Sequence, residues 1–153
     1  MTVTPYDFYH MTGLRLKGAT ISLDDVSGIQ LGLNMLGRKY STETIRYSDL
    51  VSDYMLLPQR IAEEHVRMAR AFVLHLLGAY LFATSGQTVS LRWLTLFQDF
   101  GEAQRANWGQ ACLAYHYSTL DTLTWGILRQ LVGLWDLLEF SSLFISCISI
   151  CSL

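Results

Sequence analysis

Large aromatic side chains alternate with glycine and alanine through residues 68–117, and this alternation limits the possible folds more than any other feature of the sequence. Three apolar segments carry it, at residues 76–82, 91–100 and 108–115. Small residues let helix backbones approach closely, and aromatic side chains fill the space beside them. The stretch therefore predicts helices packed on one another, and it lacks the converging polar groups that a catalytic pocket needs.

Length and composition predict one domain with a real hydrophobic core. The chain has 153 residues, of which 51% are hydrophobic and only 16% are charged. Its net charge of −2 gives no global electrostatic reason to bind nucleic acid or acidic lipid. Three cysteines without a Cys-x-x-Cys pair argue against a disulfide framework and favour a reducing compartment. No signal peptide is expected, because the first residues lack a basic start and a long apolar core.

A mainly α fold is expected, as a single helical domain over residues 13–140 around one long helix at 59–82. Pro58 suits the first turn of that helix, and its second half is apolar on nearly all sides, which places it in the centre of the fold. Further helices are expected over residues 48–56, 90–97, 103–117 and 122–140.

The N-terminal part is expected to be less regular. Residues 1–12 are predicted to be a loose lead-in, and 13–21 a small β-hairpin turning at Gly18. Ser22, followed by acidic residues, predicts the capped start of a helix that stops near Gly37.

The last segment, residues 141–153, carries no charge and is rich in serine, isoleucine, leucine and cysteine. It is too short to span a bilayer, which takes about 20 residues. The preceding helix carries Arg129, Asp136 and Glu139, so it does not extend the segment into a clean span. Three interpretations remain: a segment packed on the core, a translated non-coding or truncation remnant, and a membrane role.

Candidate metal ligands are sparse, and neither a metal nor another cofactor is expected. Cys112 and His116 lie four apart on one helix face, and His75 lies on the central helix. Two such ligands could hold zinc, but a structural site takes four ligands and a catalytic site three plus water. A packed cysteine with a hydrogen-bonded histidine is the favoured interpretation. The Glu-Glu-His run at 63–65 lacks the order of a metalloprotease helix.

Arg60, Arg67 and Arg70 form the only local basic cluster found in the sequence, with spacings that place them near one helix face. Ion pairing with Glu63 and Glu64 explains them most simply, because Arg60 and Glu64, like Glu63 and Arg67, are four apart. Contact with a nucleic acid or a partner is the alternative.

Four sequence phrases follow one another: Leu-Leu-Gly-x-x-Leu-Phe at 76–82, Val-x-Leu-Arg-Trp-Leu at 89–94, Asp-Phe at 99–100 and Trp-Gly-x-Ala-x-Leu-Ala-Tyr at 108–115. Together they resemble the plant mobile domain family, which includes proteins labelled as homologues of protein phosphatase 7, long form. The signature residues, which we expect to be mainly core residues, are Leu76, Leu77, Gly78, Phe82, Leu91, Arg92, Trp93, Leu94, Asp99, Trp108, Gly109, Ala111, Ala114, Tyr115 and Trp135.

The resemblance implies a nuclear protein that takes part in transposon silencing and genome stability, without established catalysis. The metal-binding motifs of the phosphatase catalytic domain are missing, so the phosphatase label does not transfer. The first hypothesis is therefore a non-enzymatic helical module that binds another protein or itself, in an apparently short copy of the domain. The second is a domesticated or decayed transposon fragment with weak nucleic-acid contact through the three arginines. A membrane partner is not expected, and an enzyme with an unrecognised site is a third interpretation.

Overall fold

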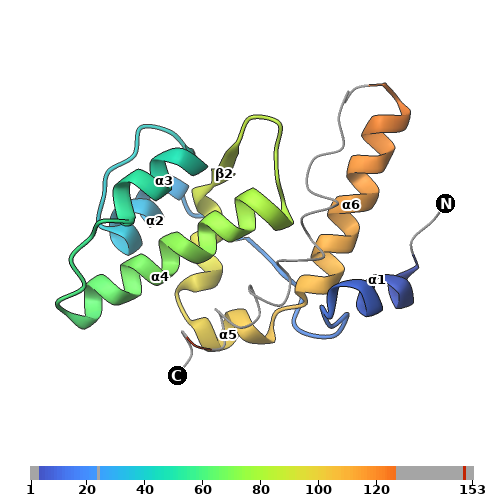
Figure 1. Cartoon of the computed structure of the whole chain (residues 1–153), viewed down its shortest axis with the longest axis horizontal. Coiled ribbons are helices and arrows are strands. Elements are labelled where there is room, and N and C mark those ends of the chain that lie inside the picture. Colours follow the sequence, from blue (N-terminus) through green and yellow to red (C-terminus); the bar gives the residue numbers. More distant parts are fainter. Residues whose placement is uncertain (1–3, 24, 127–149, 151–153) are drawn as a thin grey trace.

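Helices make up most of the regular structure in the computed structural model, which describes residues 4–23, 25–126 and 150 (Figure 1). The predicted mainly α class is confirmed. In chain order the elements are α1 (Pro5–Thr12), α2 (Gly28–Leu31), the π-helix η1 (Gly32–Leu36), β1 (Thr44–Arg46), α3 (Tyr47–Tyr54), α4 (Ala62–Leu76), the π-helix η2 (Leu77–Leu81), β2 (Thr88–Ser90), the 3₁₀ helix η3 (Leu91–Phe97), α5 (Phe100–Arg105) and α6 (Trp108–Thr124).

The long central helix predicted at 59–82 exists as α4 continued directly by η2. Its second half is buried as expected, and Val73, Leu74 and Leu77 have no exposed surface. The helix begins at Ala62, so Pro58 lies outside its first turn. The start is fixed by the Glu64 carboxylate, which accepts hydrogen bonds from the amides of Arg60 and Ile61 at 2.8 and 3.3 Å.

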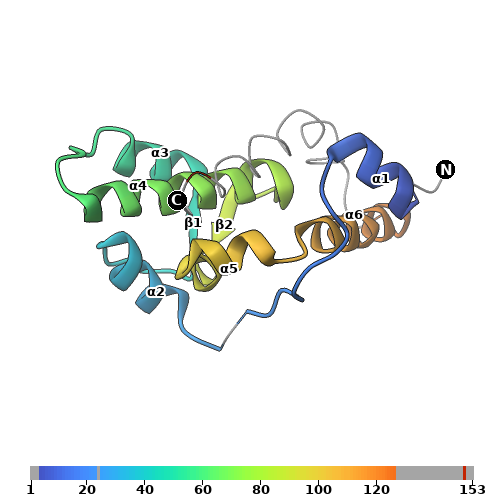
Figure 2. The ribbon, with the colours of Figure 1, turned by 90° about the horizontal axis from the view of Figure 1, so that it is seen from below.

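The hairpin predicted at 13–21 is wrong. The two strands of the described sheet are β1 and β2, which pair antiparallel with Ile45 opposite Val89. Residues 14–23 instead form an extended segment that runs from α1 towards α2 (Figure 2). Ala19 exchanges backbone hydrogen bonds with the corner between α5 and α6, from its amide to the Arg105 carbonyl and from the Asn107 amide to its carbonyl, both at 2.9 Å. These partners lie far away in the sequence, so a local turn pattern could not reveal them.

A helix replaces the loose lead-in expected over residues 1–12. The Thr4 hydroxyl accepts a hydrogen bond from the Asp7 amide at 3.2 Å, and the Asp7 carboxylate accepts one from the Thr4 amide at 3.1 Å. This capping box, with Pro5 in the first helical position, starts α1, and Gly13 ends it in the left-handed conformation. Phe8 is buried where α1 packs against α6.

The helix predicted from Ser22 begins only at Gly28. Its cap comes from Glu43, whose carboxylate accepts hydrogen bonds from the Ser27 hydroxyl at 2.8 Å and the Gly28 amide at 2.6 Å. The bond to Ser27 is the main reason why the pKa of Glu43 is lowered. The predicted stop near Gly37 is confirmed, because Gly37 adopts the left-handed conformation after η1.

The other helix predictions are confirmed in part. The helix expected over residues 48–56 is found as α3, which begins one residue earlier and ends at Tyr54, and residues 90–97 contain η3, which is a 3₁₀ helix. The helix expected over 103–117 is divided between α5 and α6, with a break between them, and α6 continues through the expected start at residue 122. Residues 127–140, with Trp135, and all of the 141–153 segment except Ile150 lie outside the described residues.

An aromatic cluster of Phe82, Trp93, Phe97, Trp108 and Tyr115 joins η2, η3 and α6. Phe82 stacks on Trp93 with ring centroids 4.7 Å apart, and Phe97 stacks on Trp108 at 6.1 Å. Tyr115 meets Phe82 edge-on at 5.3 Å. Trp108 and Phe97 are buried, whereas Trp93 and Tyr115 are partly buried and pack against the core.

Replacing Trp108 with alanine should destabilise the protein by about 3–5 kcal/mol, because it removes a buried aromatic ring and leaves a cavity. The same change at Trp125 is the matched control, since Trp125 is 79% exposed and Trp108 only 5%. Urea unfolding followed by circular dichroism measures both. A Trp108→Ala protein as stable as the Trp125→Ala protein would contradict the buried role of Trp108.

Candidate functional site

An apolar groove lies between α3 and α4. On α3, Leu50 and Tyr54 point into the core, while Val51 and Met55 stay exposed one residue further on. The groove has a volume of about 250 Å³. The described residues of its lining include no acidic residue, lysine or arginine, so the groove can hold an apolar side chain but offers little for catalysis. The residues of this α3–α4 groove are Leu50, Val51, Tyr54, Met55, Met68, Ala71, Phe72 and His75.

His75 is the one ionisable imidazole in the α3–α4 groove. The rings of Tyr47 and Tyr80 meet it edge-on at 6.1 and 6.3 Å. Its Nδ1 is buried without a hydrogen-bond partner in the described part of the chain, and burial lowers the pKa of the imidazole. His75 is therefore neutral at pH 7. No three histidine, cysteine, aspartate or glutamate residues among the described ones lie close enough to hold a metal ion together.

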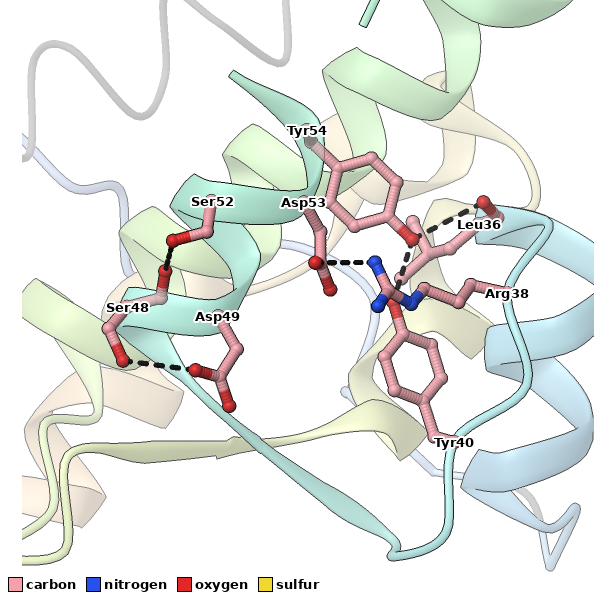
Figure 3. A network of polar contacts seen from close by, with 8 residues as sticks. All are labelled: Leu36, Arg38, Tyr40, Ser48, Asp49, Ser52, Asp53 and Tyr54. Atoms are coloured by element: carbon pink, nitrogen blue, oxygen red, sulfur yellow. Dashed lines mark hydrogen bonds and ion pairs between the residues drawn. The ribbon is translucent and has the colours of Figure 1, made fainter. Parts of the chain in front are cut away.

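A polar network ties the segment after η1 to α3, and one of its members, Tyr54, also lines the groove (Figure 3). The hydroxyls of Tyr40 and Tyr54 are hydrogen-bonded at 2.6 Å, and the Tyr54 hydroxyl also donates to the Leu36 carbonyl at 3.3 Å. Arg38 and Asp53 form an ion pair beside them. Burial raises the pKa of both tyrosines, so both hydroxyls stay protonated and can keep donating.

A polar cavity of about 540 Å³ adjoins this network. Arg38, Lys39 and Arg46 line it together with Asp49 and Asp53. Because charges of both signs face the same space, the cavity favours neither anions nor cations. Its carboxylates flank no histidine or cysteine in the lining, and we assign no chemistry to it.

The predicted arginine cluster is largely used inside the fold. Arg67 pairs with Glu63 as expected, and its guanidinium covers the backbone of Gly37, where a Cβ would lie 2.8 Å from Nη1. Arg70 donates from Nε to the Phe97 carbonyl at 3.0 Å, and burial lowers its pKa. Glu64 meets the backbone amide of Arg60 and not its guanidinium, as far as the hydrogen bonds of the described residues show. Arg60 is thus the most available of the three arginines for an outside partner.

Cys112 and His116 lie where α6 packs against α1. Cys112 is fully buried, and burial raises the pKa of its thiol to about 12, so the thiol is protonated and unreactive. His116 is only 6% exposed, and its ring lies 6.1 Å from that of Phe8. Neither ring nitrogen has a hydrogen-bond partner in the described part of the chain, so the hydrogen bond expected for this histidine is not found there.

The buried imidazole of His116 predicts a loss of stability in acid. Burial lowers its pKa in the folded state below the ordinary value of 6.5. As the pH falls below about 6.5, the unfolded chain therefore binds a proton that the folded chain resists, and the free energy of unfolding decreases. A His116→Leu variant should lose less stability than the unaltered protein between pH 7 and pH 5, measured by urea unfolding. Equal losses would contradict the prediction.

The residues of the predicted signature have different structural roles. Leu77, Leu91 and Leu94 are fully buried. Asp99 starts α5 by accepting a hydrogen bond from the Gly101 amide at 2.7 Å. Arg92 pairs with exposed Asp25. Ala114 is exposed, which corrects its expected core role. The remaining signature residues that the structure describes are buried or partly buried: buried are Leu76, Gly78, Phe82, Trp108 and Gly109, and partly buried are Trp93, Ala111 and Tyr115.

Sequence reasoning missed the Tyr40–Tyr54 pair and the Glu43 cap. Both depend on hydrogen bonds between segments that are 14 or more residues apart. It also missed that Val51 and Met55 remain exposed, because apolar residues on an amphipathic helix are usually assigned to the core. Within the described residues, no helix is both long and apolar enough to cross a membrane.

Comparison with known proteins agrees with the sequence signature. The model of the plant mobile domain matches residues 1–144. The chain is 29% identical to Protein MAIN-LIKE 1 of Arabidopsis thaliana over 94% of its own length, and 31% identical to Protein MAIN-LIKE 2 of the same plant over 78%. It is 30% identical over 78% of its length to the Arabidopsis thaliana serine/threonine-protein phosphatase 7 long form homolog.

The chain spans 31%, 19% and 10% of the lengths of these three relatives, in the order given. No solved structure shows a significant match. The family match covers well over half of the chain and includes all four sequence phrases of the signature. The chain therefore belongs to the plant mobile domain family.

Proposed function

We propose that this chain is a non-enzymatic helical interaction module of the plant mobile domain type. By the family resemblance, it acts in the nucleus in transposon silencing and genome stability. The observation that carries the interaction role is the α3–α4 groove, an exposed apolar surface whose described lining residues carry no acidic, lysine or arginine side chain. Exposed apolar grooves between helices are common sites of protein association.

A second copy of the chain is the proposed occupant of the groove. Met55 and Leu56 project strongly into solvent directly beside the groove that Val51 and Phe72 line. In a two-fold dimer, a projecting side chain of one copy can enter the groove of the other, and the reverse contact forms by symmetry. A projection and a matching groove on one patch are what such a self-complementary interface requires.

A Phe72→Glu variant should abolish self-association, because the dimer would have to bury the new carboxylate in an apolar groove. Light scattering over a range of protein concentrations measures the oligomeric state. The matched control is Leu33→Glu, since Leu33 is 44% and Phe72 48% exposed and Leu33 is not part of the groove lining. Control and unaltered protein should both associate. A clean monomer of the unaltered protein at high concentration would contradict the proposal.

The proposal includes no phosphatase activity and no stoichiometric metal. Cys112 is buried and protonated, and the described His, Cys, Asp and Glu side chains form no metal-binding group. Purified protein should release no phosphate from a model ester and contain less than one zinc per chain. Zinc at one per chain that is lost in a Cys112→Ser variant would overturn the metal statement. Phosphate release that one point mutation abolishes would overturn the other.

A transposon-derived fragment with nucleic-acid contact through Arg60, Arg67 and Arg70 is the second candidate function. The internal contacts of Arg67 and Arg70 weaken it, because a phosphate would have to compete with Glu63 and with the Phe97 carbonyl. Transposase or polyprotein remnants beside the coding region would favour this origin.

A further inference from the structure

A different set of cations surrounds a cavity at the other end of the molecule from the α3–α4 groove. The cavity has a volume of about 730 Å³ and lies where the end of α1, the following segment and the corner between α5 and α6 meet (Figure 1). Its polar and aromatic lining comes from Tyr9, Arg15, Lys17, Gln104, Arg105 and Trp108. The sequence separates Arg105 from Arg15 by 90 positions, so no local pattern reveals the group.

Among the residues that the structure describes, the lining has three cations and no carboxylate. Among the described residues, Arg15, Lys17 and Arg105 form no ion pair, whereas Arg38, Arg67 and Arg92 each pair with an acidic residue. Glu102 lies near Arg105 in a neighbouring cavity, but no salt bridge joins the two side chains. A protein with a net charge of −2 thus carries a local excess of positive charge in one concave place.

The backbone that carries these cations is held firmly. The Asn107 side-chain amide donates to the Leu16 carbonyl at 3.2 Å, and the Ala19 amide donates to the carbonyl of Arg105 itself at 2.9 Å. Gly109 permits this packing, because a Cβ there would lie 2.5 Å from the Arg15 carbonyl oxygen. The backbone positions of the three cations are therefore set before any ligand arrives, which lowers the cost of ordering them on binding.

An exposed aromatic ring and a helix terminus complete the cavity. Tyr9 of α1 lines it and is 44% exposed; its ring meets that of His10 edge-on at 5.6 Å. Aromatic rings of this kind can stack with a base. The first residue of α6, Trp108, also lines it, so the positive end of a 17-residue helix lies at the cavity. Three cations that form no ion pair within the described part of the chain, a helix N-terminus and an exposed aromatic ring favour a ligand with several phosphates and a flat ring.

We propose that this cavity binds single-stranded nucleic acid, with Arg15, Lys17 and Arg105 contacting about three phosphates and Tyr9 stacking on a base. A single strand fits better than a duplex because its bases are free to stack and its backbone can bend into a concave site. A lipid surface is a poorer match, since a flat membrane cannot enter the cavity. The site shares no residue with the α3–α4 groove, so it does not depend on self-association.

Fluorescence anisotropy with a fluorescein-labelled 12-mer of thymidylate tests the proposal on the full chain. With three phosphate contacts, the affinity should fall about 20-fold between 50 and 200 mM salt. Combined Arg15→Ala, Lys17→Ala and Arg105→Ala changes should weaken binding at 50 mM salt at least tenfold and flatten the salt dependence. Combined Arg38→Ala, Lys39→Ala and Arg46→Ala changes remove the same number of cations from the polar cavity beside α3 and should change affinity less than threefold. Tyr9→Leu should weaken binding without changing the salt dependence.

Each other outcome would overturn the proposal. The proposal would be wrong if the protein did not bind the oligonucleotide at 50 mM salt. It would also be wrong if the two triple variants lost the same amount of affinity. Tighter binding of a duplex of the same length would contradict the single-strand assignment, and displacement of the oligonucleotide by vesicles of phosphatidylserine would assign the cavity to lipid. If circular dichroism shows that the first triple variant is unfolded, the exposed single change Lys17→Glu takes its place and should weaken binding at least threefold.

Discussion

The packing of Trp108 is the interaction on which most of the described structure depends. Its ring stacks on Phe97, and its Nε1 donates a hydrogen bond to the Ala103 carbonyl at 2.7 Å. These contacts fix the corner between α5 and α6 against η3, and η3 packs on α4. The Tyr115 hydroxyl joins α6 to the end of the central helix, because it donates a hydrogen bond to the Ala83 carbonyl just after η2 at 2.6 Å. A ring with one polar atom suits this position, because it fills space and also satisfies a buried carbonyl.

The sequence predicted the parts of the fold that local apolar patterns determine. The buried second half of α4 with η2, the short helix α3, η3 and the stop at Gly37 all follow from periodicity, small residues and a C-terminal glycine. Elements that depend on distant partners could not be predicted in this way. The start of α2 depends on the Glu43 carboxylate, which accepts a hydrogen bond from the Gly28 amide. The segment after Gly18 pairs with the α5–α6 corner instead of folding into a hairpin.

The candidate sites were less accessible to sequence reasoning than the fold. The spacing of Arg67 and Arg70 predicts that both lie near one face of the helix. That face turns partly inward, where Arg67 contacts Gly37 and Arg70 donates to the Phe97 carbonyl. The basic cavity combines Arg15 with Arg105, and only the tertiary structure brings them together. Apolar periodicity also cannot say which residues of an amphipathic helix remain uncovered, so the exposure of Met55 had to come from the structure.

Two proposed surfaces at opposite ends of the molecule share one scaffold, and this sets how changes at each should combine. The α3–α4 groove and the basic cavity have no residue in common, so changes at Phe72 and at Lys17 should act independently. Trp108 differs, because this residue lines the basic cavity and its ring belongs to the cluster that supports η3 and, through it, α4. Loss of this ring should therefore affect both surfaces, because it disturbs the fold that carries them. A substitution at Phe72 or Lys17 should affect only the surface to which that residue belongs. A change near Trp108 thus reports on a binding role only when stability is measured beside binding.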